Sequence, residues 1–111
     1  MCGRYSLKSD PSKIAKEFNL SDKETENLKP RYNIAPSQPV AALIRDQEAR
    51  LNFLNWGLIP SWSKDPSIGA RMINARQETL AEKPSFRGLL KSCRCLILAD
   101  GFYTYTGPRP K

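Results

Sequence analysis

The sequence contains no histidine in its 111 residues. This absence removes histidine general acid–base catalysis, serine–histidine and cysteine–histidine nucleophile pairs, and histidine-ligated metals from the chemistry these residues can perform. Any reaction carried out by this sequence must therefore use a cysteine, a carboxylate, an amide, a lysine or the terminal amine.

Cysteine is scarce, with only three residues, at positions 2, 93 and 95. An odd number of cysteines in a sequence without a secretion signal favours free thiols over a disulfide framework. Cys93 and Cys95 flank a single arginine just before an apolar run, so we predict that both are buried on one face of a strand. With so few ligands we expect no metal and no cofactor, although a metal-binding or redox role for the three cysteines is one alternative to test.

Long apolar runs are also missing. Runs such as Leu96-Ile-Leu-Ala99 are far too short to cross a bilayer. Charged residues at Lys8, Asp10 and Lys13 interrupt the start of the sequence, so no signal-peptide core can form there. We therefore expect no membrane partner and a cytoplasmic or nucleoid-associated protein.

The sequence does have a surplus of basic residues. It carries 18 Lys and Arg against 11 Asp and Glu, for a net charge of +7. This balance favours a polyanionic partner, although a merely basic, solvated surface would give the same count. Several arginines lie among apolar or aromatic neighbours, a placement that suits bidentate phosphate contacts. These are Arg4, Arg71, Arg76, Arg87 and Arg94.

Short helices precede a hairpin in the first half of the sequence. Asp10 and Pro11 predict the start of a helix over residues 10–20. The spacing of Ser21 and Glu24 predicts a capping box for a second helix that ends near Leu28. Apolar runs at 40–44 and 51–56 predict a β-hairpin, followed by a loop over 57–66.

The second half is predicted to mix turns, helices and strands. We expect a short strand or extended turn at 70–76, helices at 78–81 and 84–91, a strand at 93–99, and a turn leading into a strand over 102–105. These elements predict one α+β domain over 1–111 built on antiparallel strands. The last strand would need a partner beyond residue 111, so we expect the C-terminal part of the domain to be missing.

Five short segments carry the functional signal, although each alone is more typical of a structural role. They read Met1-Cys-Gly-Arg4, Arg31-Tyr-Asn-Ile-Ala-Pro36, Trp56-Gly-Leu-Ile-Pro-Ser-Trp62, Ile73-Asn-Ala-Arg-Gln-Glu78 and Ala99-Asp-Gly-Phe-Tyr103. In this order they resemble the SOS response-associated peptidase (SRAP) family, whose members share M-C-G-R, R-Y-N-x-A-P, W-G-x-x-P-x-W, N-A-R-x-E and A-D-G-F/W-Y/F-E-W. The resemblance covers residues 1–105 and implies a barrel-like antiparallel fold with short helices. It also implies a DNA-repair module that senses abasic sites in single-stranded DNA.

The resemblance gives Cys2 the central role. It implies autocatalytic removal of Met1, the family's peptidase activity, which leaves Cys2 with a free α-amine beside its thiol. The ordinary pKa values of these groups are about 7.7–8.0 and about 8.5, so reactive forms of both exist near neutral pH. The amine can form a Schiff base with the aldehyde of a ring-opened abasic site, and the thiol can close a thiazolidine. The structural alternative is that Cys2 is only a small buried residue.

Other roles follow from matching motif positions. Asn74 looks like the family's active-site asparagine, which lies beside the cysteine and orients the opened sugar. Arg4 and Arg76 resemble contacts to phosphate or sugar. Pro36 and Trp62 resemble the residues that wedge and stack against bases around the lesion, a mode that tolerates any sequence.

The sequence departs from the family pattern at Thr104. The family has a glutamate there that serves as an acid–base residue, whereas a threonine hydroxyl exchanges no proton near neutral pH. The family histidine of a later motif has no counterpart either. We therefore expect a monomer that binds single-stranded DNA with abasic sites and retains the Cys2 chemistry at a reduced rate. The alternative is a non-catalytic DNA-binding remnant of the family.

Overall fold

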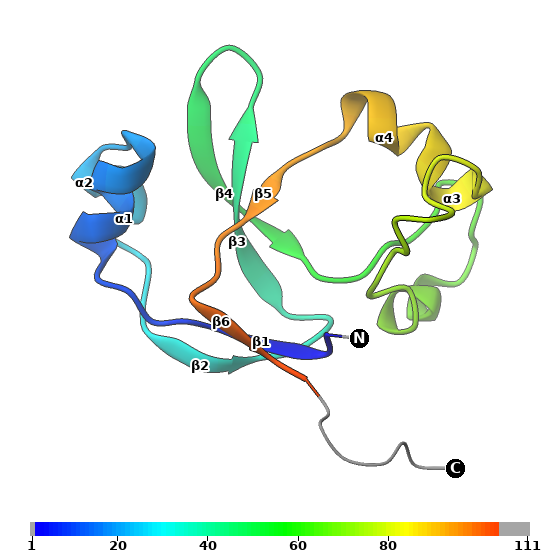
Figure 1. Cartoon of the computed structure of the whole chain (residues 1–111), viewed down its shortest axis with the longest axis horizontal. Coiled ribbons are helices and arrows are strands. Elements are labelled where there is room, and N and C mark those ends of the chain that lie inside the picture. Colours follow the sequence, from blue (N-terminus) through cyan, green and yellow to red (C-terminus); the bar gives the residue numbers. More distant parts are fainter. Residues whose placement is uncertain (1, 105–111) are drawn as a thin grey trace.

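The computed structural model describes residues 2–104, in which short helices flank two antiparallel three-stranded sheets (Figure 1). The sheet orders are β2-β1-β6 and β4-β3-β5. The elements are β1 (Arg4–Leu7), α1 (Pro11–Phe18), α2 (Asp22–Thr25), β2 (Arg31–Ile34), β3 (Pro39–Arg45), β4 (Ala49–Asn55), the 3-10 helix η1 (Pro66–Ala70), α3 (Pro84–Arg87), α4 (Leu89–Ser92), β5 (Leu96–Ile97) and β6 (Gly101–Tyr103). This confirms the α+β prediction, but across residues 2–104 the two sheets do not close into a barrel.

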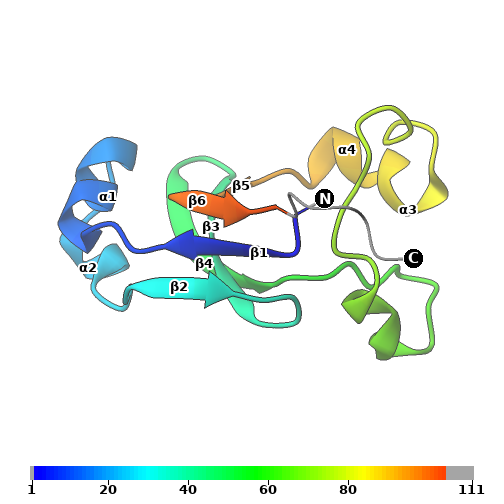
Figure 2. The same cartoon turned by 60° about the horizontal axis from the view of Figure 1, so that its bottom comes forward.

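The first sheet is built around β1. Tyr5 lies opposite Ile34 on β2 and opposite Phe102 on β6 (Figure 2). Because successive side chains of a strand point to opposite faces, Tyr5 and Leu7 of β1 are buried while Arg4 and Ser6 are not, and Ile34 of β2 is buried opposite Tyr5.

Asp100 joins the start of β6 to the chain that leaves β1. Its carboxylate accepts hydrogen bonds from the Ser9 hydroxyl and from the backbone N–H groups of Ser9 and Lys8, at 2.8 and 2.5 Å respectively. These bonds, that from the Ser9 hydroxyl above all, hold the pKa of the carboxyl below its usual value. The turn predicted at Asp100 and Gly101 thus links the start of β6 to residues 8–9, which follow β1.

The second sheet contains the predicted hairpin. β3 and β4 pair along their whole length, from Pro39 opposite Asn55 to Arg45 opposite Ala49. β5 adds a short edge, with Ala42 opposite Ile97. The hairpin prediction is therefore confirmed.

The predicted strand at 93–99 is shortened to two residues. Cys93 caps the end of α4, with its N–H donating to Leu89 O at 2.8 Å, so the chain reaches the sheet only at Leu96. Cys93 and Cys95 are both exposed, and the prediction that they are buried strand residues is wrong. The helix that ends just before them is the physical reason.

The first two helices begin where the sequence predicts. Asp10 caps α1 and accepts a hydrogen bond from Ser12 N at 2.9 Å, and Asn19 ends the helix in the left-handed conformation. The capping box of Ser21 and Glu24 opens α2. That helix ends at Thr25, short of Leu28, because a single turn follows instead of further helix.

The segment from 57 to 92 contains little regular structure. Residues 70–76 form a turn and extended chain with no strand pairing, and 78–81 form turns where a helix was predicted. The predicted helix at 84–91 is present as α3 and α4, which meet at Gly88. No helix within residues 2–104 is long and apolar enough to span a membrane.

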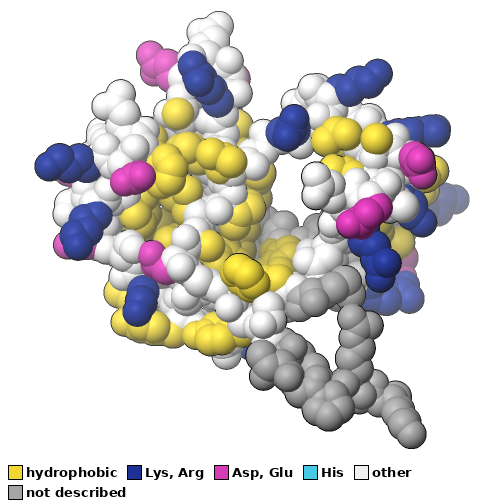
Figure 3. Space-filling model, in the orientation of Figure 1, with side chains coloured by type: hydrophobic (Ala, Val, Ile, Leu, Met, Phe, Trp, Pro, Cys, Tyr) yellow, Lys and Arg dark blue, Asp and Glu magenta, His cyan; other side chains and the backbone are white. Residues whose placement is uncertain are grey.

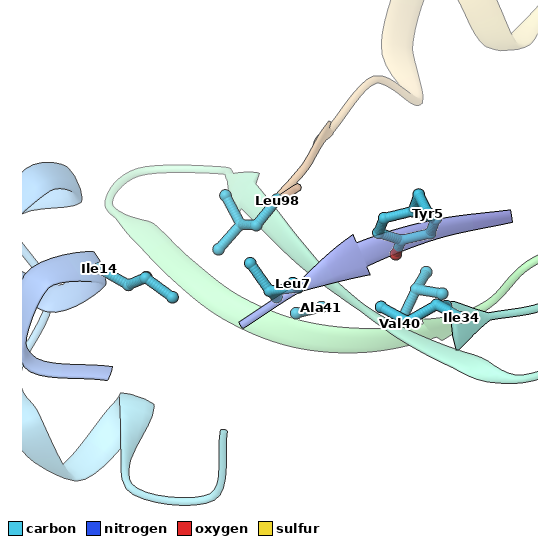
Figure 4. Close-up of a cluster of buried hydrophobic side chains, with 7 residues drawn as sticks. All are labelled: Tyr5, Leu7, Ile14, Ile34, Val40, Ala41 and Leu98. Atoms are coloured by element: carbon cyan, nitrogen blue, oxygen red, sulfur yellow. The ribbon is translucent and has the colours of Figure 1, made fainter. Parts of the chain in front are cut away.

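The core lies between the two sheets and against α1 (Figure 4). Its buried side chains come from β1, α1, β2, β3 and the chain after β5: Tyr5, Leu7, Ile14, Ile34, Val40, Ala41 and Leu98. Trp56 packs against this cluster, with its ring centroid 5.5 Å from that of Tyr5 in an edge-to-face arrangement. The core therefore lies on the side of the sheets that faces α1. The helices η1, α3 and α4 lie at the opposite end of the molecule from α1 and α2 (Figures 1 and 2).

Candidate functional site

Cys2 lies just before β1, half-buried, at the edge of a hollow of about 600 Å³. Its thiol donates to Arg4 O at 3.4 Å. The hollow opens between the two sheets and is lined by Cys2, Tyr5, Val40, Leu54, Asn55, Trp56, Gly57, Leu58, Ile73, Asn74, Cys95, Ile97, Ala99 and Phe102. We call it the Cys2 hollow. Cys2 is therefore partly accessible from the surface and is not a fully buried packing residue.

Asn74 reaches Cys2 from a segment 72 residues away in the sequence. Its side-chain Nδ2 donates to the backbone oxygen of Cys2 at 2.9 Å. The indole Nε1 of Trp56 donates to Ile73 O at 2.9 Å and thereby holds the residue before Asn74. The W-G and N-A-R segments thus position one side chain beside the N-terminal cysteine.

A close approach between two glycines supports this placement. Gly57 has a φ of +136°, and a Cβ there would come within 2.3 Å of the carbonyl oxygen of Gly69. Leu58 N donates to Met72 O at 2.9 Å directly beyond this approach. The chain that carries Asn74 can lie this close only because residue 57 has no side chain.

The lining of the Cys2 hollow is largely apolar. Figure 3 shows hydrophobic side chains gathered over the region of the sheets, whereas Lys and Arg project around the periphery. Burial raises the pKa of the Tyr5 hydroxyl, an effect that the charge of Arg31 partly offsets. No hydrogen-bond partner for this buried hydroxyl is present among residues 2–104. Amine and thiol chemistry at Cys2 would therefore take place beside an apolar wall.

Thr104 follows β6 directly and is exposed. Arg4 lies opposite Tyr103 in the antiparallel register, and this pair ends the ladder at the side where Cys2 precedes β1 and Thr104 follows β6. Phe102 lines the Cys2 hollow, whereas Thr104 is not among the residues that line it. Thr104 therefore lies just past the end of β6, the strand that pairs with β1 next to Cys2.

Arg4 and Arg76 are exposed, two residues from Cys2 and Asn74 respectively. Arg4 Nη1 donates to Asn33 Oδ1 at 3.1 Å, which ties β1 to the R-Y-N segment. Pro36 lies half-buried in the loop whose next residue donates to Trp56 O at 2.8 Å. Arg4 and Arg76 are therefore near the Cys2–Asn74 contact in the sequence, and Pro36 is linked through Ser37 to Trp56, which lines the Cys2 hollow; none of the three candidates lines that hollow itself.

Trp62 lies apart from the other candidates. Its side chain is 62% exposed, and it lines a separate hollow of about 340 Å³ with residues of α3 and the 57–62 loop. The structure therefore brings Cys2 and Asn74 into contact but does not bring Trp62 into the same hollow.

Sequence reasoning missed two features of the site. Cys95 lines the Cys2 hollow, although its exposure contradicts the buried position expected for it. Arg31 donates to Pro39 O at 2.6 Å and to Gln38 Oε1 at 2.9 Å, which braces the loop carrying Pro36. The position of Arg31 at the head of the R-Y-N motif was the available signal for it. Within residues 2–104, no three or more Cys, Asp or Glu side chains come together as metal ligands.

The fold and the site together define an α+β protein whose candidate nucleophile is its second residue. A sequence model described as SOS response associated peptidase (SRAP) matches residues 1–111. The chain belongs to this family.

Named relatives agree with this assignment. "Abasic site processing protein YoqW" of Bacillus subtilis is 50% identical over 113 residues, covering all of this chain and 50% of YoqW. "Abasic site processing protein HMCES" of Xenopus tropicalis is 30% identical over 130 residues, covering 95% of this chain and 39% of HMCES. A crystal structure of a Bacteroides thetaiotaomicron protein shares the fold with a TM-score of 0.71 at 24% identity, over 91% of this chain and 47% of that one. The chain thus spans about half the length of the YoqW relative and of the solved structure.

Proposed function

We propose that this chain carries the nucleophilic half of an abasic-site processing centre and bonds covalently to single-stranded DNA through Cys2. The observation that carries the proposal is the contact between Asn74 Nδ2 and Cys2 O at the edge of the Cys2 hollow. Asn74 fixes the backbone of the second residue, and so holds its α-nitrogen and thiol in a defined position. The names of the relatives, abasic site processing proteins, support the substrate part of the proposal, an abasic site in DNA.

The reaction requires removal of Met1 and then forms two bonds at one carbon. The α-amine of Cys2 attacks the aldehyde carbon of the ring-opened sugar, and the resulting carbinolamine loses water to give an iminium ion. The thiolate sulfur then adds to the same carbon and closes a five-membered thiazolidine. One water leaves in total, and no oxidant or reductant is needed. Because both nucleophiles are on adjacent carbons of one residue, the second step is intramolecular and fast.

The surrounding residues bind the DNA and position the sugar. Arg4 and Arg76 are exposed beside the Cys2–Asn74 contact and would pair with the phosphates that flank the lesion. Pro36 would wedge against the neighbouring base, and Trp62, with its exposed ring, would stack on a base farther along the strand. The basic charge of the chain favours the same partner.

Thr104 makes the proposed reaction slow. The residue follows β6 directly, at the same end of the strand pair as Cys2, where a carboxylate would exchange protons with the sugar and the amine. A threonine hydroxyl cannot take that role near neutral pH. We propose that this chain acts as a monomer in a single, slow crosslinking event.

The test is the formation of a denaturation-stable adduct with a single-stranded oligonucleotide that carries one abasic site. The wild-type chain and a Cys93→Ser variant should form it, since Cys93 is exposed and does not line the hollow. A Cys2→Ser variant keeps the amine but cannot close the ring, so it should form only an adduct that hydrolyses. An oligonucleotide with a tetrahydrofuran in place of the abasic sugar has no aldehyde and should give none.

A second candidate function is binding of single-stranded DNA without covalent chemistry. The departure at Thr104 favours it, because the family's acid–base residue is missing there. Salt-sensitive binding of equal strength to abasic and tetrahydrofuran oligonucleotides, with no adduct from either, would establish this function in place of the first.

A further inference from the structure

The first sheet has a second face, which points away from the Cys2 hollow. Phe102 on β6 lines the hollow, so the next residue, Tyr103, points to the opposite side of the sheet. Tyr5 on β1 lines the hollow as well, so Arg4 points to the same side as Tyr103. Within residues 2–104, no helix crosses the three strands where Figure 2 shows them side by side in front of the second sheet. We call this surface the outer sheet face; its side chains come from Arg4, Ser6, Asn33 and Tyr103, with Gly101 between them.

The ring of Tyr103 is held across the middle strand of this sheet. Its hydroxyl donates to Tyr32 O at 2.8 Å. Because β1 lies between β6, which carries Tyr103, and β2, which carries Tyr32, the side chain must span β1. Gly101 and Ser6 lie opposite each other beside this path, and one has no side chain while the other has a short one. The ring therefore has a fixed position over the strand, and the residue remains 55% exposed.

Arg4 places a positive charge directly beside this ring. It pairs with Tyr103 in the antiparallel register, and its Nη1 donates to Asn33 Oδ1 at 3.1 Å. The strands β1, β2 and β6 contain no Asp or Glu, and among the described residues no carboxylate forms a salt bridge with Arg4. The guanidinium keeps further N–H donors for an anion. The outer sheet face is therefore complementary to a negatively charged partner.

An exposed aromatic ring next to a free guanidinium suits a nucleotide. A base can stack on the ring while the guanidinium binds a phosphate. The other members of the outer sheet face are polar or lack a side chain, so the face does not offer the contiguous apolar area typical of a protein-docking site.

We propose that the outer sheet face binds a nucleotide of single-stranded DNA, with a base stacked on Tyr103 and a phosphate paired with Arg4. This inference rests on the proposed function, since it assigns a further contact to the same DNA strand. The pair of Arg4 and Tyr103 ends the β1–β6 ladder on the side where Cys2 precedes β1. A strand whose abasic sugar lies at Cys2 reaches the outer sheet face by passing this end of the sheet. The contact requires an unpaired base and accepts any of the four, because every base has a face that can stack.

Photo-crosslinking tests the proposal on the unaltered chain. The full 111-residue chain is irradiated with an undamaged single-stranded oligothymidylate in which 5-iodouracil, a base that reacts with aromatic rings stacked on it, replaces thymine. This DNA carries no aldehyde, so the result does not depend on any reaction at Cys2. Peptide mass spectrometry should locate an adduct on Tyr103, and the same strand in a duplex should give none there.

Three variants measure what the ring contributes to binding, by fluorescence anisotropy of a labelled oligothymidylate. Tyr103→Ala should weaken binding about tenfold, within the range expected when one stacked base loses its partner. Tyr103→Phe keeps the ring and loses only the bond to Tyr32 O, so its affinity should stay within about threefold of the wild type. Phe53→Ala removes another exposed ring, from β4 of the second sheet, and should leave the affinity unchanged. Circular dichroism of the free variants checks that they fold.

Three results would overturn the proposal. The first is a set of adducts that form elsewhere on the chain but not on Tyr103, and the second is a folded Tyr103→Ala variant that binds as tightly as the wild type. Either result, with the DNA still bound, removes this contact and leaves the proposed function intact. The third is an oligouridylate that binds more tightly than the DNA of equal length and depends equally on Tyr103, which would assign the face to RNA. A wild-type chain that binds no single-stranded DNA at all would overturn both this proposal and the proposed function.

Discussion

Replacing Gly57 with alanine should destabilise the chain and displace Asn74. A residue with a side chain at a φ of +136° carries a backbone strain on the order of 1–3 kcal/mol. The new Cβ would also meet Gly69 O at 2.3 Å, and relieving such a contact in a packed region costs about 1–3 kcal/mol more. Since about 1 kcal/mol shifts the melting temperature of a chain of this size by about 4 °C, the expected loss is on the order of 10–20 °C.

Gly88→Ala is the matched control for this substitution. Gly88 has a helical backbone with a φ of −74°, and a Cβ there would have no other heavy atom within 4 Å beyond its local chain. Alanine at that position should stabilise the chain by about 0.5–1 kcal/mol. Thermal unfolding followed by tryptophan fluorescence measures both variants. The close approach of Gly57 to Gly69 would be refuted if Gly57→Ala melted within about 2 °C of the wild type, since about 1 kcal/mol corresponds to about 4 °C.

Four further predictions concern the site and its supports. Asn74→Asp places an acceptor against the oxygen of Cys2, so the crosslinking rate should fall and stability should drop by about 1 kcal/mol; an unchanged rate in a gel time course would contradict this role. Asp100→Asn should lower the free energy of unfolding at pH 7 by about 1–2 kcal/mol, because bonds to a charged group are strong but an exposed group is screened. Because the folded pKa of Asp100 is depressed, this difference should persist above about pH 4, near the unfolded value, and disappear as pH falls through the folded pKa; denaturation curves across that range check it. Trp62→Ala should weaken binding to single-stranded DNA by about 1–3 kcal/mol without changing the rate at saturation, and a slower saturated rate would place Trp62 in the chemistry. Thr104→Glu should raise the crosslinking rate about tenfold or more, since a positioned acid–base group contributes at least about 10²-fold when its surroundings are complete; an equal rate would refute the acid–base argument.

Local signals in the sequence were sufficient for the elements that begin at caps and turns. Asp10, the Ser21–Glu24 box and the Asp100 turn each make the side-chain bonds that their residue types predict. The prediction of the β3–β4 hairpin is correct because its two apolar runs are bounded by polar residues. These features depend on neighbours within a few positions.

Tertiary context decided the elements that the sequence did not reveal. The strand expected over 93–99 is short because α4 carries the chain up to Cys93 before it can pair. Residues 70–76 take the extended-turn alternative and form no strand, because this segment is held by bonds to the 56–58 region and not by a strand partner, and the helix predicted at 78–81 is absent. The contact between Asn74 and Cys2 joins residues 72 positions apart, so no local pattern could predict it, and only the family resemblance indicated that the two lie together.

The position of the N-terminal cysteine leads to one direct measurement. Intact-mass spectrometry of the purified chain, before and after incubation with abasic single-stranded DNA, reports both the maturation of residue 1 and the covalent product. The proposed reaction predicts a chain without Met1, and then a product whose mass is that of this chain plus the oligonucleotide minus one water. Material that retains Met1 throughout, or that shows no added mass after incubation, would contradict it.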